Sequence, residues 1–285
     1  MSVCMERIRA EADISSDIPM TYAGRLDPMA EGLVVFLVGD MRFQKEQMLK
    51  MDKTYRVEFF LGYETDTYDV LGMAQKSQYP SVLRTAPLKE GATSKRLFHG
   101  SHIGELREAV RGMQEITMQT IKSFRPTGTF IQNFPAYSSR KVDGKPLFAH
   151  AKESNDVPVE SHNVTVYNYS DFKQTEIGSE QLLGSIFSDI KKVDGDFRQD
   201  ESIQSWEKVS SSFPETITMY EINMSVSSGF YVRQWVSDIG RFLSTGAVTF
   251  RIVRDTIGIF TMSMLNGESY RVFNEHDPLI QNLTK

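Results

Sequence analysis

Hydrophobic and polar residues alternate in two segments of this chain, residues 53–61 and 216–226. Apolar side chains at every second position lie on one face of an extended strand, so both segments are predicted to be strands with one face against a core. Residues 162–169 also have a strand-like pattern, and a last strand is expected within residues 256–262.

Helical periodicity replaces this alternation between residues 227 and 246, in the sequence SSGFYVRQWVSDIGRFLSTG. Apolar residues separated by three or four positions form one stripe here: Val232, Trp235, Val236, Ile239 and Leu243. The stripe predicts an amphipathic helix, with Ser227 or Ser228 capping its start and Gly246 following its end. A second helical spacing covers residues 105–121. Because strands and helices mix without regular β–α–β alternation, the pattern predicts the α+β class.

Composition limits the kinds of protein this chain can be. Residues 75–101 and 189–212 follow neither period and are expected to be surface insertions in one domain of residues 1–285. No apolar run reaches about 18 residues, and the N-terminus lacks the apolar core of a signal peptide. Cys4 is the only cysteine and the five histidines are scattered. We therefore expect a cytoplasmic protein with no membrane span, disulfide or metal site.

The net charge of −5 is distributed unevenly along the chain. Residues 122–152 contain six basic residues and one acidic residue, whereas residues 153–221 contain 14 acidic and five basic residues. The basic segment also carries aromatic residues and prolines, and we expect an exposed loop with a turn at Asp143-Gly144. Because phosphate contacts need only a local patch, the acidic total does not exclude a nucleic-acid partner.

The stretch AGRLDPMAEGLVVFLVGD, residues 23–40, places one carboxylate in a tight turn before an apolar run. Pro28 disfavours helical dihedral angles at Asp27, and Gly24 permits a close approach of the backbone to another group. The turn can therefore hold Asp27 at the edge of the core. The alternative is that Asp27 caps a turn or helix, because aspartate is a common turn former.

Two other residues have side chains that could take part in recognition or catalysis. Tyr55 lies on the apolar face of a predicted strand, where its phenol could stack on a planar ring; the alternative is a core tyrosine. Arg233 lies on the polar side of the predicted helix with Ser237 and Arg241; the alternative is a solvated helix face. The sequence pattern alone does not bring Asp27, Tyr55 and Arg233 together.

Four ordered blocks of the sequence resemble the TruB family of tRNA pseudouridine synthases. They are AGRLDPMAEGLVVFLVGD, KTYRVEFFLGYETDTYDVLG, PAYSSRKVDGKPLF and SSGFYVRQWVSDIGRFLSTGAVTFRIVRDTIGIF, and they span residues 23–260. The resemblance implies a pseudouridine synthase fold, with a mixed or antiparallel central sheet flanked by helices and loops. It also implies isomerisation of a flipped-out T-loop uridine of tRNA (position 55), without a cofactor or metal, by a monomer.

The resemblance assigns a role to each candidate residue. Asp27 corresponds to the catalytic aspartate, acting on the ribose as nucleophile or as base. Tyr55 corresponds to the tyrosine that stacks on the uracil and takes the carbon-5 proton, and Arg233 corresponds to the arginine that pairs with the aspartate. The residues expected to contact RNA are Tyr22, Arg25, Arg140, Lys141, Lys145 and Arg254.

The chain departs from the family pattern at several points. Tyr22 replaces the usual histidine, and the aspartate block reads GRLD instead of the commoner GTLD. We expect a shortened N-terminal strand and no C-terminal PUA domain. The alternatives to a tRNA pseudouridine synthase are a non-catalytic RNA-binding or RNA-folding protein on the same scaffold, and an unrelated α+β binding protein.

Overall fold

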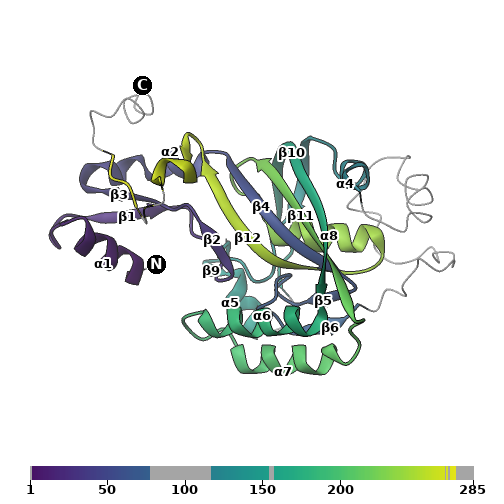
Figure 1. Ribbon diagram of the computed structural model, residues 1–285. Coiled ribbons are helices and arrows are strands. Elements are labelled where there is room, and N and C mark those ends of the chain that lie inside the picture. The colour runs from purple at the N-terminus through teal and green to yellow at the C-terminus, as the bar shows by residue number, and fades with distance from the viewer. Residues whose placement is uncertain (1, 78–116, 154–156, 267, 269, 274–285) are drawn as a thin grey trace.

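The computed structural model describes residues 2–77, 117–153, 157–266, 268 and 270–273 (Figure 1). The helices are α1 (Ser2–Glu11), η1 (Gly39–Gln44), α2 (Lys45–Lys50), α4 (Met118–Phe124), α5 (Leu147–Glu153), α6 (Ser179–Lys192), α7 (Gln199–Ser210), α8 (Val232–Leu243) and η3 (Met262–Leu265). The strands are β1 (Met20–Ala23), β2 (Ala30–Gly32), β3 (Val35–Val38), β4 (Lys53–Leu61), β5 (Tyr63–Thr65), β6 (Ala74–Lys76), β7 (Gly128–Asn133), β8 (Lys141–Val142), β9 (Lys145–Pro146), β10 (Ser161–Gly178), β11 (Thr216–Val226), β12 (Ala247–Ile257) and β13 (Phe260–Thr261).

A seven-stranded sheet in the order β13-β12-β4-β11-β10-β7 forms the centre of the molecule. Adjacent strands in this order are antiparallel. The seventh strand, β2, lies off this path and pairs in parallel with β12, so the sheet is mixed. The predicted strands at residues 53–61 and 216–226 are confirmed with the same bounds. β10 continues well beyond residue 169, and β12 starts nine residues before residue 256. The predicted α+β class, with a mixed sheet flanked by helices, is confirmed.

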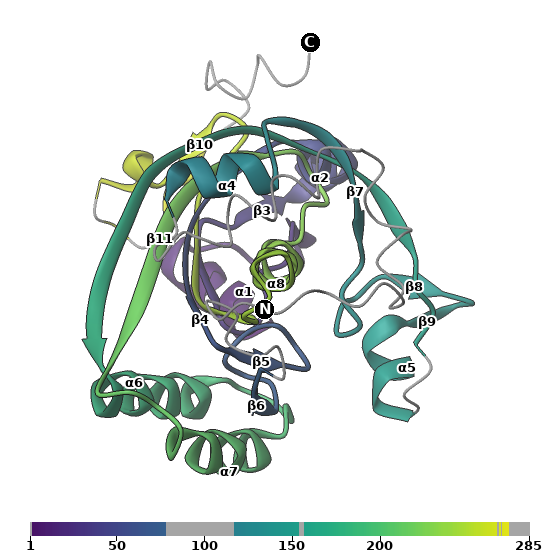
Figure 2. The same ribbon diagram turned by 90° about the vertical axis from the view of Figure 1, so that its right-hand side faces the viewer.

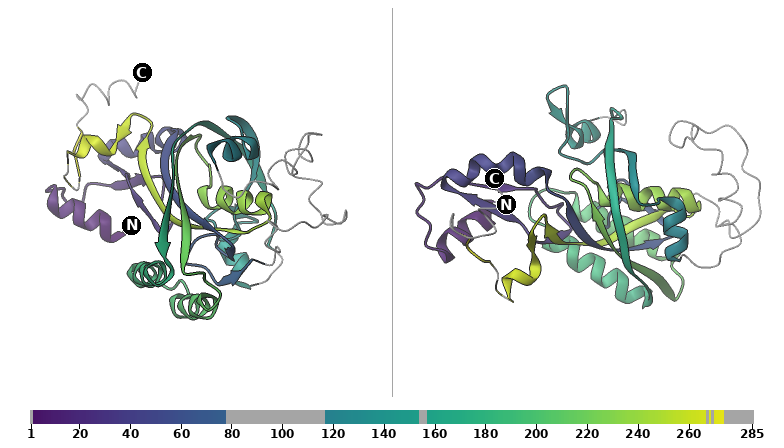
Figure 3. Two further views of the ribbon diagram at one scale, coloured as in Figure 1. Left: turned by 45° about the vertical axis from the view of Figure 1, so that its right-hand side comes forward. Right: turned by 90° about the horizontal axis from the view of Figure 1, so that it is seen from above.

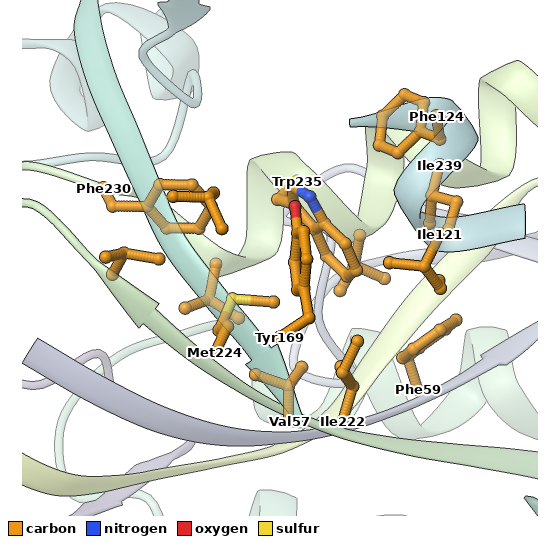
Figure 4. Close-up of a cluster of buried hydrophobic side chains, with 14 of the residues drawn as sticks. Val57, Phe59, Ile121, Phe124, Tyr169, Ile222, Met224, Phe230, Trp235 and Ile239 are labelled. Atoms are coloured by element: carbon orange, nitrogen blue, oxygen red, sulfur yellow. The ribbon is translucent and has the colours of Figure 1, made fainter. Parts of the chain in front are cut away.

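Helix α8 lies in the hollow of the curved sheet, with α4 beside it (Figure 2). The stripe predicted for this helix is buried: Trp235, Val236 and Ile239 belong to a cluster that includes Phe59 and Ile222 of the sheet (Figure 4). Burying a large apolar side chain contributes about 1.5–3 kcal/mol, so this cluster fixes α8 firmly on the sheet.

The ends of α8 differ in part from the expectation. Its N-cap is Tyr231, without a side-chain cap bond, and the Ser227 hydroxyl instead accepts from the Thr165 backbone N–H at 2.8 Å. The chain leaves the helix through Ser244 in the left-handed region, and the Gly246 N–H donates to the Gly240 carbonyl at 3.2 Å. Gly246 therefore follows the helix end as predicted, whereas the predicted serine cap is wrong.

Helices α6 and α7 cover the opposite face of the sheet (Figures 1 and 3). Leu182, Ile186 and Ile190 of α6 recur every four residues and are fully buried, and Trp206 of α7 packs beside them. Residues 189–212 are therefore part of a core layer, and the expectation of a surface insertion there is wrong.

Smaller expected features have mixed outcomes. The hairpin of β8 and β9 turns at Asp143 and Gly144, both with positive φ, which confirms the predicted turn. Of the helix expected at residues 105–121, only the end falls in the described residues, where α4 starts at residue 118. The expected insertion at residues 75–101 lies outside the described residues from residue 78 onwards.

The N-terminal strands form a small lobe at one end of the sheet (Figure 1). β1 pairs with β3, and the Leu33 and Leu37 side chains pack with Met48 of α2 and Ile257 of β12. The apolar run after Asp27 is therefore partly buried, as its composition predicts, and it ties the preceding turn to the main sheet.

Candidate active site

A cleft of about 410 Å³ lies at the start of helix α8. Its walls come from the Asp27 turn, the segment after β5, the loop before β8, helix α5, the connector between α6 and α7, and the start of α8. The lining residues are Arg25, Leu26, Asp27, Pro28, Thr67, Asp69, Leu71, Tyr137, Ser138, Ser139, Phe148, Lys152, Asp196, Phe197, Arg198, Tyr231 and Arg233. The volume lies within the ordinary range of about 300–1,000 Å³ for small-molecule sites.

Asp27 and Arg233, which are 206 positions apart, form a bidentate ion pair in this cleft. The Arg233 Nε donates to Asp27 Oδ2 at 2.7 Å, and Nη2 donates to Oδ1 at 3.0 Å. Such a fork fixes the plane of a carboxylate as well as its position. Both carboxylate oxygens are thus engaged and no helix begins at this turn, so Asp27 is not a helix cap.

Arg233 is buried at the base of the cleft, with 3% of its surface exposed, so the interpretation as a solvated helix face is wrong. Its Nη1 donates to the Thr67 carbonyl at 2.6 Å, and Nη2 also donates to the Tyr137 carbonyl at 3.2 Å. Burial acts to lower the pKa of Arg233, but the charges of Asp27 and Asp69 raise it overall. The guanidinium therefore remains a fixed cation.

Asp69 is a second carboxylate beside Arg233, with its Oδ2 3.6 Å from Nε. Its side chain accepts from the Thr67 hydroxyl at 2.6 Å and from the Leu71 N–H at 3.1 Å. Burial raises the pKa of Asp69, and the Arg233 charge opposes that shift. One buried arginine thus lies between two carboxylates, of which Asp27 is the more exposed at 37% of its side chain.

The Asp27 turn is held in place by Arg254, which was expected to contact RNA. Arg254 is 2% exposed, and it donates to the Leu33 carbonyl and to the Gly24 carbonyl, each at 2.8 Å. Its guanidinium also interacts with the Tyr55 phenol, so the structure places Arg254 in the interior and not on a surface that could contact RNA. The backbone at Gly32 lies so close to β12 that a Cβ there would be 2.4 Å from the Arg254 carbonyl oxygen. Gly24 has φ +80°, a conformation that favours glycine.

Tyr55 is half-buried on β4 and is not among the residues that line the cleft. Its ring packs against the cluster under α8. Burial raises the pKa of its phenol, while Arg254 opposes the shift and Asp27 adds to it. The hydroxyl is therefore within electrostatic reach of Asp27, although Tyr55 is not among the residues that line the cleft.

The aromatic residues that line the cleft are Tyr137, Phe148, Phe197 and Tyr231. Burial raises the pKa of Tyr231, and the neighbouring Asp27 charge raises it further. None of these four residues was predicted from the sequence to belong to the site. Tyr231 offered a signal, since it stands two positions before Arg233 at a helix start, and Tyr137 lies within one of the four quoted blocks.

The residues predicted to contact RNA occupy different surroundings. Arg25 is exposed at the cleft, whereas Tyr22 lies outside its lining, with the Lys45 Nζ 5.8 Å from its ring centroid. Arg140 pairs with Glu160 at 3.1 Å, Lys145 pairs with Glu153, and Lys141 is exposed on β8. These last three basic residues lie on or beside the β8–β9 hairpin, at the edge of the molecule next to α5 (Figure 2).

Neither a metal-ligand cluster nor a membrane-spanning helix is found among the described residues. Within it, no three or more histidine, cysteine, aspartate or glutamate side chains are arranged to hold a metal ion. The helices of that part are all too short or too polar to cross a membrane.

The geometry defines an α+β protein with one accessible carboxylate oriented by a buried arginine. Residues 19–100 match the model of the TruB family pseudouridylate synthase N-terminal domain. Over 244 residues the chain is 26% identical to tRNA pseudouridine synthase B of Blochmanniella floridana, covering 86% of this chain and 67% of the relative. It is 24% identical to tRNA pseudouridine synthase 4 of Schizosaccharomyces pombe, covering 94% and 72%.

A third relative is tRNA pseudouridine synthase B of Aromatoleum aromaticum, with 27% identity over 85% of this chain and 54% of the relative. The chain thus spans between about half and three quarters of the length of these relatives. A solved Cbf5-Nop10-Gar1 complex is similar with a TM-score of 0.42 and 14% identity, over 91% of this chain and 45% of that chain. Through this family model and these relatives, the chain is similar to the TruB family of pseudouridylate synthases.

Proposed function

We propose that this protein converts a T-loop uridine of tRNA (position 55) to pseudouridine, with Asp27 as the catalytic carboxylate. One observation carries the proposal: the Asp27 carboxylate is exposed to a cleft and held by two hydrogen bonds from a buried arginine. The named relatives, which are tRNA pseudouridine synthases, support tRNA as the substrate.

The proposed reaction exchanges one bond of the nucleoside for another. The bond between N1 of uracil and C1′ of the ribose breaks, the base rotates, and C5 bonds to C1′. C5 then loses its proton and N1 gains one, so the product is an isomer and no oxidant, reductant or cofactor is consumed. Asp27 acts on the ribose, either as a nucleophile or as a base, and Arg233 keeps its carboxylate in one orientation.

The substrate has to enter as a single extruded nucleotide. A uridine in a folded T-loop is stacked, and enzymes that act on a base first extrude it into a pocket. Tyr137, Tyr231 and Asp27 line a space of suitable size. The basic segment of residues 122–152 then contacts phosphates of the T-arm around the cleft. We propose that the protein acts in the cytoplasm as a monomer.

The decisive experiment measures product and binding on the same unmodified tRNA transcript. Wild-type protein should release tritium from [5-³H]uridine-labelled transcript, because C5 loses its hydrogen. Asp27→Asn is nearly isosteric and should bind tRNA with unchanged affinity but form no pseudouridine. Asp40→Asn, at a carboxylate that is 95% exposed and lies outside the cleft lining, is the matched control and should remain active.

Turnover by a pure Asp27→Asn preparation would refute the role of Asp27. A wild-type protein that binds tRNA tightly but forms no product would favour a non-catalytic RNA-binding or RNA-folding protein. Neither binding nor product would leave only an unrelated binding function.

A further inference from the structure

The connector between α6 and α7 sends one arginine into the cleft wall. Arg198 lies just before α7 with φ +60°, a left-handed conformation that few residues other than glycine adopt. Its Nη2 donates to Asp66 Oδ2 at 2.9 Å, and its guanidinium carbon is 5.0 Å from the ring centroid of Tyr137. The arginine thus bridges a carboxylate and an aromatic ring that come from two other segments.

Both partners of Arg198 are themselves held in place. Asp66 accepts from the Met73 N–H at 2.8 Å through its other oxygen. The Tyr137 carbonyl accepts from Arg233 Nη2 at 3.2 Å, and the same Nη2 donates to Asp27 at 3.0 Å. Burial and the Asp66 charge raise the pKa of Tyr137, and Arg198 opposes the shift, which is consistent with close packing of the three groups. A continuous set of contacts therefore runs from Arg198 to the catalytic carboxylate.

Helices α6 and α7 do not need Arg198 to hold them on the sheet. Trp206 Nε1 donates to the Val70 carbonyl at 2.8 Å, and the Ser202 hydroxyl donates to the Leu71 carbonyl at 2.5 Å, both in the interior. Together with the buried leucine and isoleucines of α6, these contacts already fix α6 and α7 on the sheet. The Arg198 side chain is 29% exposed and lines the cleft, so its contribution lies at the site.

We propose that Arg198 is a positioning residue of the nucleotide pocket. It holds the Tyr137 ring as one wall of the cleft and, through the Tyr137 backbone, maintains the orientation of Arg233 on Asp27. This proposal rests on the proposed function for its effect on rate, but its effect on Tyr137 does not depend on catalysis.

The test compares three variants by three measurements. Arg198→Met removes the guanidinium and keeps an apolar stem, Arg198→Lys keeps the charge without the planar group, and Arg251→Met is the matched control. Arg251 also lies near an aromatic ring (5.4 Å, Phe250) and near carboxylates, one of them on α6, but outside the cleft. The measurements are ¹⁹F NMR of 3-fluorotyrosine placed at position 137, and single-turnover rate and affinity on a tRNA transcript.

We expect Arg198→Met to shift the position-137 resonance and to lower the single-turnover rate by about 10- to 100-fold, with tRNA affinity within about twofold of wild type. Arg198→Lys should fall between, and Arg251→Met should change neither. An unshifted resonance in Arg198→Met, or an equal shift in Arg251→Met, would overturn the proposal. So would a change in affinity alone. A shifted resonance in a protein whose wild type forms no pseudouridine would support the role at Tyr137 and refute the proposed activity.

Discussion

The base of the cleft and the basic segment of residues 122–152 both depend on charged side chains, but they use them differently. At the base, Arg233 is almost completely buried and makes four hydrogen bonds, two of them to Asp27. In the basic segment, Arg140 and Lys145 are partly exposed and each pairs with one carboxylate at the surface. The first arrangement fixes geometry, whereas the second leaves side chains that can exchange partners.

This difference separates the requirements of catalysis from those of binding. A buried ion pair loses much when one partner is removed, because the other is left without compensation. A surface pair contributes about 0–1 kcal/mol and is screened by salt. We therefore expect changes at the base of the cleft to act on product formation and stability, and changes in the basic segment to act on affinity and its salt dependence.

The largest effect is expected for Arg233→Met. It should abolish detectable product and lower the free energy of unfolding by about 3–5 kcal/mol, because Asp69 then remains buried without its cation. Arg241→Met, eight positions further along α8 and more exposed, is the control and should change both quantities little. Chemical denaturation and the tritium assay measure the two effects. A stable and active Arg233→Met protein would contradict this account of the cleft.

The stability cost of Arg233→Met should also depend on pH. The folded-state pKa of Asp69 is raised above 3.8 by burial, and Arg233 opposes that shift, so its removal should raise the pKa further. A carboxyl with a raised pKa favours folding at low pH and loses that contribution as pH rises through its folded value. The gap in unfolding free energy between wild type and Arg233→Met should therefore be wider at pH 8 than at pH 5. A constant gap would mean that Asp69 does not depend on Arg233.

Much of the fold could be predicted because burial of one strand face imposes a period of two. The bounds of β4 and β11 agree with the prediction, and the stripe of α8 is the one that packs on the sheet. The helix α6 was missed although Leu182, Ile186 and Ile190 show a clear four-residue spacing. That signal was available in the sequence, but the acidic and polar residues around it suggested a surface segment.

The candidate site was less predictable than the fold. Asp27 and Arg233 came from a family resemblance, and the ion pair that joins them depends on the packing of α8, which no local pattern specifies. The burial of Arg254 was missed because an arginine in a strand gives no sign of whether carbonyl groups surround it. Arg198 was missed for the same reason, since its partners Asp66 and Tyr137 lie far away in the sequence.

An intermediate effect is expected at Tyr55, which packs against the core cluster and belongs to neither of the two regions being compared. Tyr55→Phe keeps the ring and should bind tRNA as wild type does, but it should form product at least about tenfold more slowly if the hydroxyl takes the carbon-5 proton. Tyr55→Leu should also bind more weakly, since stacking of a base on an aromatic ring contributes about 1–3 kcal/mol. That range corresponds to about one to two decades in affinity.

The structure gives a specific way for the Tyr55 prediction to fail. Its ring packs against the core cluster under α8 and lies outside the cleft lining. If Tyr55 serves only that packing, Tyr55→Phe should be almost silent and Tyr55→Leu should mainly lower the melting temperature. Rate, affinity and thermal unfolding of both variants distinguish the two roles.

The smallest effects are expected in the basic segment, and they should differ among its members. Neutralising Arg140, Lys141 and Lys145 together should weaken tRNA binding and flatten its salt dependence, because each lost phosphate contact reduces the log–log slope by about 0.7–0.9. Lys141 has no ion pair among the described residues, so Lys141→Ala should reduce the log–log slope by nearly the full amount of one phosphate contact. Arg140 and Lys145 must first break their ion pairs with Glu160 and Glu153 before they contact phosphate. Substituting either of them alone should therefore reduce the slope by less. Affinities measured across a salt series give the slopes, and an unchanged slope in the triple variant would mean that the RNA binds elsewhere.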